Sequence, residues 1–234
     1  MFTGPNIITD GLVLCLDAAN TKSYPGSGTT WSDLSGNGNN GTLVNGPTFD
    51  SGNNGSIVFD GVNDYITTGT NLSDNNFPNN VYTLVCWFNW NGTVGGSDGR
   101  AYLLQNGGSN FPLSLEINSR DFTPARFATW EHTTNGSSHR NSSVNVDTNR
   151  WYCFVVSKGI SNTIKMFVDG DEIFSTTSIG GSLLPFSGVR IGTHRFTNNR
   201  WFGGNIAQVS IYNRALTASE ILQNYKATKS RYGL

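Results

Sequence analysis

The sequence predicts an all-β fold, a jelly-roll sandwich of two antiparallel sheets with one short C-terminal helix. Three observations predict it. Short apolar runs rich in Val, Ile, Phe and Tyr recur along almost the whole chain of 234 residues. Clusters of Gly, Asn, Ser and Asp separate these runs, as turns separate the short strands of a sandwich. Helical spacing of apolar residues stands out at one place, near the C-terminal end.

The predicted strands are rich in β-branched and aromatic residues, which suit a half-buried pleated surface. The clearest pair is a hairpin over residues 163–177, where Asp169 and Gly170 supply the tight turn. Tyr65 and Ile66 indicate a further strand after a polar break. The main runs lie at residues 11–17, 56–60, 82–90, 101–105, 113–117, 125–130, 151–157, 163–170, 172–177, 189–192 and 206–212.

The helix is predicted over about residues 217–229. Thr217 and Glu220 fit a capping box, in which a hydroxyl and a carboxylate satisfy free backbone N–H groups at the helix start. Ile221 and Tyr225 then lie on one apolar stripe at helical spacing. We expect this stripe to pack on the sandwich.

The chain is expected to form a single domain at residues 10–234, preceded by an N-terminal arm at residues 1–9. The arm holds Phe2, Ile7 and Ile8, too few apolar residues for a core of its own. Two alternatives remain open: the arm covers an edge of its own sandwich, or it adds a strand to a neighbouring subunit.

Composition excludes several classes of partner. Net charge is -1, charged residues make up 13%, and no Lys/Arg run appears, so we expect no nucleic-acid partner. No apolar run approaches the ~18 residues of a membrane span, so we expect no membrane partner. The first residues show neither a charged leader nor an apolar signal core, which favours synthesis in the cytoplasm.

The three cysteines, Cys15, Cys86 and Cys153, each lie inside an apolar strand-like run. None belongs to a CxxC pair, and a disulfide scaffold would be denser in cysteine. We therefore expect buried, free thiols that act as small apolar side chains.

A polar break, Asp60-Gly61-Val62-Asn63-Asp64, separates the strands at residues 56–60 and 65–66. Three roles are open to its carboxylates: a tight turn, a calcium site or catalysis. Gly61 permits a sharp bend, and Asp side chains accept hydrogen bonds from nearby backbone N–H groups, so a turn is favoured. No cofactor is expected to be required, while calcium stays open, since hard oxygen ligands on rigid loops suit it.

The ordered set of segments resembles the laminin-G-like, concanavalin A-like jelly-roll family, of the compact type found in bacterial and tailed-phage structural proteins. "SIVFDGVNDYI" resembles the family's most recognisable stretch, and "IYNRALTASEI" with "RYGL" resembles its closing region. The chain departs from the pattern at Ala207-Gln208, where relatives often carry an acidic pair. The other segments are "GLVLCLDAAN", "WSDLSGNGNNGTL", "YTLVCWFNW" and "RWYCFVVSKGISNTIKMFVDGDEI".

The family includes glucanases, but the residues favour a protein that is not an enzyme. Glycosidases need two carboxyl groups held close together. Glu116 and Glu131 each stand alone in their strands, and the G-x-S-x-G string at residues 95–99 lies between strands instead of at a strand–helix elbow. The histidines lack zinc-binding spacing.

Carbohydrate binding is better supported. A tryptophan ring beside amide, carboxylate and guanidinium groups suits a sugar, whose faces are apolar and whose edges form hydrogen bonds. Trp87 and Trp151 are predicted to be core, while Trp31 and Trp90 adjoin polar loops and are candidates for exposure. The predicted carbohydrate-binding residues are Trp130, Glu131, His132, Arg195, Asn198, Asn199, Arg200 and Trp201.

These observations lead to three hypotheses for function. The first is a non-enzymatic virion structural protein of a bacteriophage, a capsid-decoration or fibre-associated subunit that binds surface glycans. It would be made in the host cytoplasm and lie on the virion surface, with other virion proteins, copies of itself and cell-surface polysaccharide as partners. The alternative is a cellular carbohydrate-binding or adhesion domain. A glycoside hydrolase is the least favoured.

Overall fold

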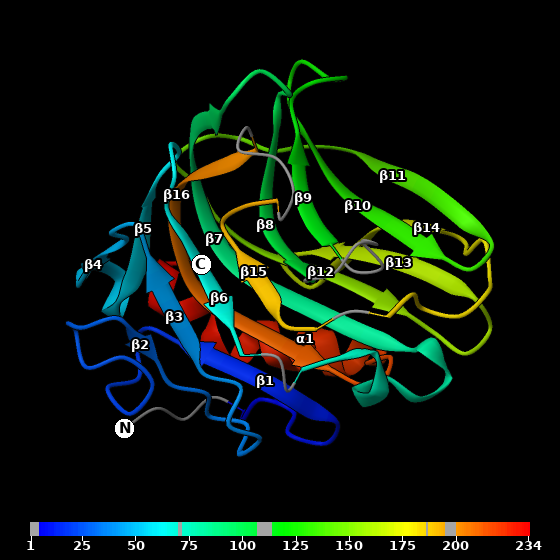
Figure 1. The fold of residues 1–234 in the computed structure, drawn as a ribbon, viewed down its shortest axis with the longest axis horizontal. Helices are drawn as coiled ribbons and strands as arrows, with labels where there is room; N and C mark the ends of the chain where they lie inside the picture. Colours follow the sequence, from blue (N-terminus) through cyan, green and yellow to red (C-terminus); the bar gives the residue numbers. More distant parts are fainter. Residues whose placement is uncertain (1–4, 70–71, 107–113, 186, 195–199) are drawn as a thin grey trace.

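A computed structural model of the chain describes residues 5–69, 72–106, 114–185, 187–194 and 200–234. Within them, the strands form two antiparallel eight-stranded sheets packed face to face (Figure 1), so the predicted sandwich is confirmed. The first sheet has the order β14 (Asp171–Thr177), β13 (Thr163–Val168), β12 (Trp151–Lys158), β7 (Tyr82–Gly95), β16 (Trp201–Tyr212), β5 (Ser56–Asp60) and β4 (Thr48–Asp50), with β1 (Leu12–Asp17) also paired to β16.

The second sheet faces the viewer in Figure 1. Its order is β11 (Gly136–Asn145), β10 (Arg126–Thr133), β9 (Ser114–Asn118), β8 (Arg100–Asn106), β15 (Val189–Ile191), β6 (Tyr65–Thr68), β3 (Gly41–Val44) and β2 (Thr30–Trp31). The sequence predicted most of these strands but missed β2, β3, β4 and β11, which are short or polar.

The main core lies between the two sheets. Phe88 of β7 packs edge-on against Phe127 of β10 and Phe202 of β16, with ring centroids 6.3 and 6.2 Å apart, respectively. Such aromatic pairs add about 0.5–1.5 kcal/mol to the free energy gained from burial. The sheets are therefore fixed relative to one another, and outward-facing side chains of the second sheet are held on a rigid frame.

A smaller core lies on the outer face of the first sheet, under helix α1 (Ala218–Thr228) and the 3₁₀ turn η4 (Lys229–Tyr232). Trp87 stacks on Tyr232 at 4.2 Å and on Tyr225 at 5.7 Å. The predicted capping box is present, because Thr217 accepts from the Glu220 N–H and the Glu220 side chain accepts from the Thr217 N–H. The helix therefore packs on the sandwich, as the sequence predicted. Three further 3₁₀ turns lie at η1 (Gly52–Asn54), η2 (Asp74–Asn76) and η3 (Pro78–Asn80).

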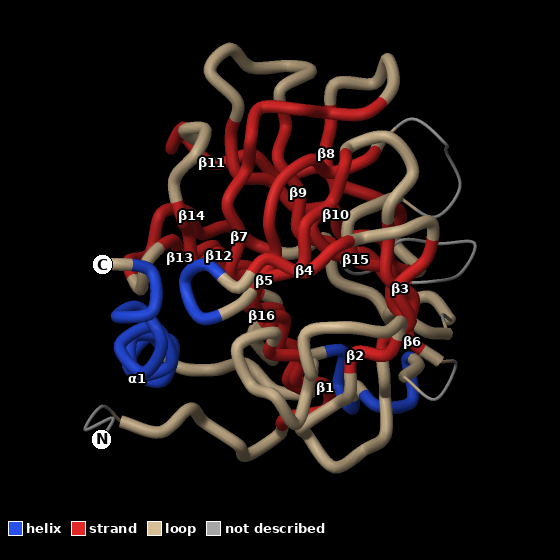
Figure 2. Tube along the Cα trace, turned by 90° about the vertical axis from the view of Figure 1, so that its left-hand side faces the viewer, coloured by secondary structure: helices blue, strands red, loops and turns tan. Residues whose placement is uncertain are grey.

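The described part of the N-terminal arm, residues 5–9, lies against this helix. The Ile8 N–H donates to Asn224 Oδ1 at 2.8 Å, and its carbonyl accepts from the Tyr212 hydroxyl at 2.9 Å. Figure 2 shows the arm, helix α1 and the C-terminal end on one side of the molecule. In this single chain the arm covers its own sandwich.

The polar break between β5 and β6 is a tight turn. Asp60 Oδ1 accepts the N–H groups of Val62 at 2.8 Å and Asn63 at 3.1 Å, while Asp64 Oδ2 accepts the Asp60 N–H at 3.0 Å. Gly61 has a φ of 76°, which explains the glycine. The predicted turn-forming role is confirmed. Among the described residues, no group of three His, Cys, Asp or Glu side chains could hold a metal ion.

The cysteines and several tryptophans are buried. Cys15, Cys86 and Cys153 are free thiols in the interior. Trp87 and Trp151 are buried as predicted, but Trp31 and Trp90, the candidates for exposure, are buried too. Both of these rings belong to the main core between the sheets. In the part of the chain that the structure describes, no helix is long and apolar enough to cross a membrane.

Candidate functional site

A cavity of about 310 Å³ opens on the outer face of the second sheet. Because side chains alternate along a strand, residues two apart point to the same face. Arg100 and Tyr102 of β8 and Trp130 and His132 of β10 thus share the cavity. We call it the aromatic cavity, lined by Arg100, Tyr102, Trp130, His132, Ser137, His194 and Arg200.

Aromatic rings form the walls of this cavity and are held in place by one another. Trp130 stacks on His139 of β11, with ring centroids 4.6 Å apart and planes 13° apart. Tyr102, 1% exposed, meets His194 edge to face at 4.8 Å. Burial, with the nearby Arg200 charge, lowers the pKa of His194 to about 3, so this ring is neutral near pH 7. The walls are therefore rigid and largely apolar.

Arginine side chains surround a single carboxylate at the edge of the cavity. Asp98 accepts from Arg100 Nε at 2.8 Å and from Arg200 Nη2 at 2.7 Å, and Arg120 Nη1 lies 3.6 Å away. Burial raises the pKa of Asp98, but the Arg200 and Arg100 contacts outweigh burial and hold it below its usual value. The Arg100 guanidinium lies 5.8 Å from the Trp130 ring centroid. Asp98 thus fixes two guanidiniums beside the aromatic walls.

A buried carboxylate lies beside the cavity on β9. Glu116 is 0% exposed and stands in register between Tyr102 of β8 and Ala128 of β10. Its Oε1 atom is hydrogen-bonded to His139 Nε2. Glu116 therefore positions the His139 ring on which Trp130 stacks.

The structure brings together three of the predicted binding residues, namely Trp130, His132 and Arg200. Trp201, 8% exposed, instead contacts Tyr65 at 6.1 Å and does not line the cavity. Arg195, Asn198 and Asn199 lie outside the described residues.

Glu131, also a predicted binding residue, points to the opposite face of β10, into the sandwich. It is 0% exposed, and Lys158 Nζ of β12 lies 3.1 Å from its carboxylate. The Ser178 hydroxyl and the Ile179 N–H also donate to it. This ion pair joins the two sheets, so Glu131 is not a wall of the cavity.

Sequence reasoning missed Arg100, Tyr102, Ser137 and His194. Tyr102 lies in the strand predicted at residues 101–105 and Arg100 directly precedes it, but the sequence did not show that this strand lies two places from β10 in the sheet. The alternation along "TWEHTT" did carry a usable signal, because it puts Glu131 on the face opposite to Trp130 and His132.

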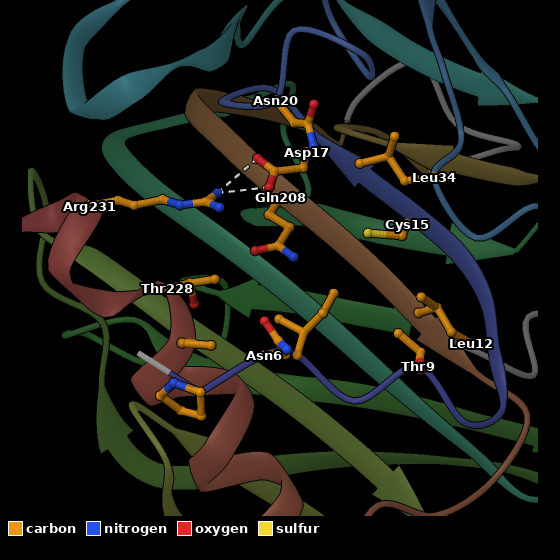
Figure 3. Close-up of a pocket in the computed structure, with 13 residues that line it drawn as sticks. Asn6, Thr9, Leu12, Cys15, Asp17, Asn20, Leu34, Gln208, Thr228 and Arg231 are labelled. Atoms are coloured by element: carbon orange, nitrogen blue, oxygen red, sulfur yellow. Dashed lines mark hydrogen bonds and ion pairs between the residues drawn. The ribbon is translucent and has the colours of Figure 1, made fainter. Parts of the chain in front are cut away.

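A second cavity, of about 340 Å³, lies between the arm, β1 and the C-terminal helix (Figure 3). Asp17 and Arg231 form a two-contact ion pair at 2.7 and 3.0 Å along one side. Gln208, at the departure from the family pattern, also lines it. No aromatic ring is among the described residues around this cavity. Its polar side chains tie the ends of the chain to β1, so the aromatic cavity is the better candidate for a ligand.

Comparisons with known proteins agree with the fold. The family described as the Concanavalin A-like lectin/glucanases superfamily matches residues 59–222. The chain belongs to this superfamily. A search of the curated proteins found no match to the sequence.

Solved structures with the same fold include parts of larger proteins. Trypanosoma rangeli sialidase in complex with sialic acid is 19% identical, with a TM-score of 0.67, over 94% of this chain and 33% of the sialidase. The binding domain of Paraclostridial Mosquitocidal Protein 1 is 17% identical, with a TM-score of 0.69, over 93% of this chain and 52% of that domain. The binding domain of botulinum neurotoxin serotype D is 13% identical, with a TM-score of 0.67, over 93% of this chain and 52% of that domain. The chain thus spans a third to a half of these proteins, and at such low identity the likeness concerns the fold.

Proposed function

We propose that this chain is a non-enzymatic carbohydrate-binding domain that holds a sugar in the aromatic cavity. The observation that carries the proposal is the combination of rigid aromatic walls with polar side chains at the edge. The apolar face of a sugar ring packs on Trp130, while Ser137, His132 and Arg200 form hydrogen bonds with its hydroxyl groups.

The comparisons support the carbohydrate-binding part of this proposal. The superfamily is described by its lectins and glucanases, and the similar structures include a sialidase bound to sialic acid and two toxin binding domains. They favour the carbohydrate-binding alternative over the virion hypothesis.

The carboxylates near the cavity favour binding without cleavage. Glu116 is bonded to His139, and Asp98 is held by arginines, so neither is placed as a free general acid or base. Burial, followed by the charge of Glu116, raises the pKa of Tyr102, so this phenol is not ionised near neutral pH. We therefore expect a bound oligosaccharide to dissociate from the protein without being cleaved.

The test is a glycan array followed by titration of the best glycan, with product analysis of the mixture. Trp130→Ala should weaken binding about tenfold or more, as for a buried aromatic anchor. Tyr65→Ala removes a partly buried ring from the same sheet outside the cavity and should leave binding within about twofold. Equal loss in both variants, or release of shorter sugars, would contradict the proposal.

The virion hypothesis is a second, finer proposal that rests on the sequence resemblance. It predicts that mass spectrometry of purified phage particles detects this chain, and that deletion of residues 1–9 leaves the domain folded but prevents incorporation. Particles that lack the protein would remove this hypothesis and leave the carbohydrate-binding proposal unaffected.

A further inference from the structure

We infer that the sugar recognised in the aromatic cavity carries an anionic group, a carboxylate or a sulfate, which Arg200 and Arg100 bind. This inference rests on the proposed function and adds the chemical class of the ligand. It comes from the charges and hydrogen-bond donors at the cavity edge.

The first argument is the balance of charge. Arg100 and Arg200 both contact the single carboxylate of Asp98 and outnumber it by two to one, while Arg120 also lies 3.8 Å from Asp121 and so adds no net charge. Glu116 supplies one further negative charge nearby, but it is fully buried and bonded to His139. Arg100 and Arg200 nevertheless line the cavity, whereas Asp98 and Glu116 are not among its described lining residues, so the fixed charges at its wall are positive. Apolar walls concentrate such a field, which favours an anion in the cavity.

The second argument is a pair of buried donors on two of the side chains that line the cavity. The Nε atom of Arg200 and the Nε1 atom of Trp130 are both buried, and neither has a hydrogen-bond partner among the described residues. A buried N–H without an acceptor costs about 1–3 kcal/mol. An ionised carboxylate or a sulfate only accepts hydrogen bonds, so it suits side chains that carry unpaired donors such as these.

The third argument is that the arginines are already in position. Asp98 holds Arg200 by Nη2 at 2.7 Å and Arg100 by Nε at 2.8 Å, so little side-chain freedom remains to be lost on binding. The planar guanidinium presents donors in a fork that matches two oxygens of one anionic group. The Trp130 ring nearby holds the body of the sugar.

The experiment uses three oligosaccharide probes of one backbone: an oligogalacturonate, the same oligomer with its carboxylates reduced to alcohols, and the reduced oligomer after sulfation. Calorimetric titrations are made with the wild type, Arg200→Gln, Arg200→Lys and the control Arg150→Gln. Arg150 is half-exposed and pairs with Asp169 away from the cavity, so its variant changes the net charge equally. Thermal melts confirm that each variant is folded.

We expect an anionic probe to bind at least about tenfold more tightly than the reduced one, with affinity that falls as salt rises. Arg200→Gln should lower the affinity for the anionic probe about 10- to 100-fold and weaken the reduced probe much less, because only hydrogen bonds to hydroxyl groups are lost there. Arg200→Lys should restore part of the loss, and Arg150→Gln should have no effect. The two anionic probes show whether the group is a carboxylate or a sulfate.

Two other outcomes separate the inference from the proposed function. If the reduced oligomer, or a neutral glycan from the array, binds as tightly as the anionic probes and Arg200→Gln weakens all alike, the inference is wrong and the proposed function stands. If no probe and no array glycan binds, both are wrong.

Discussion

Glu131 allows a direct test of whether a predicted binding residue instead stabilises the interior of the sandwich. Its carboxylate is 0% exposed and lies 3.1 Å from the Lys158 ammonium, which is 1% exposed. Replacement of Glu131 by Gln keeps the shape and an acceptor for the Ile179 N–H but leaves the Lys158 charge buried without its partner. Breaking such a pair costs about 3–5 kcal/mol. For a chain of this size, that lowers the melting temperature by roughly 6–20 °C.

The assay is urea unfolding of the wild type, Glu131→Gln, Lys158→Met and the double variant at pH 7. The double variant removes both charges, so it should regain most of the stability that either single variant loses. Glycan binding of folded Glu131→Gln should match that of the wild type. A loss below about 1 kcal/mol together with a loss of binding would refute the assignment of Glu131 to the interior.

The same ion pair predicts the direction in which stability changes with pH. Burial raises the pKa of Glu131, but the hydrogen bonds from Ser178, Ile179 and Lys158 outweigh it and lower the pKa in the folded state. The stabilisation is therefore complete above the unfolded pKa of about 4.3 and is lost as pH falls through the lower folded value. We expect the wild type to lose more stability than Glu131→Gln on acidification below about pH 4.

Four further predictions follow from the packing described above. Hydrogen bonds from Arg214 lower the pKa of Glu220 to about 2, so Glu220→Gln should cost about 1 kcal/mol at pH 7 in urea unfolding, and the difference from wild type should vanish as pH falls toward 2. Asp60→Ala should lower stability by about 1–3 kcal/mol because backbone N–H groups lose their acceptor, and a melting temperature of the wild type that rises with calcium would contradict a turn-only role. Intact mass should be the same before and after reduction, since the cysteines are free; a two-dalton increase would contradict this. Deletion of residues 1–9 should leave a folded sandwich with about 1–3 kcal/mol less stability, from the lost Ile8 hydrogen bonds; unchanged urea unfolding would show that the arm does not stabilise the domain.

Much of the fold could be predicted because the inward residues of most strands are apolar and the turns carry Gly, Asn or Asp. β11 escaped because its sequence, "GSSHRNSSVN", is polar on both faces, as suits an edge strand that pairs only with β10. That omission hid Ser137, which lines the cavity, and His139, on which Trp130 stacks.

Only part of the candidate site could be predicted, because its residues come from strands that are distant in the sequence. Trp130, His132 and Arg200 adjoin polar segments and were found from the sequence, whereas Tyr102 and Arg100 come from β8, with β9 between it and β10. Which strands become neighbours depends on the order of the sheet, and local sequence does not encode that order. The sequence prediction for Trp31 was wrong for another reason. A polar neighbour in the chain does not show whether a ring points into the core, where Trp31 lies.

The two described ends of the chain lie on the side of the molecule that carries helix α1 (Figure 2), and the aromatic cavity opens on the outer face of the other sheet. A domain with this geometry can be tethered at either end without its cavity being obstructed. Several copies fixed to one support through their ends would all display their cavities outward, at a spacing set by the support. Weak single-site affinity for a repeating polysaccharide would then add up to firm attachment, because each bound copy raises the effective concentration of sugar for the next.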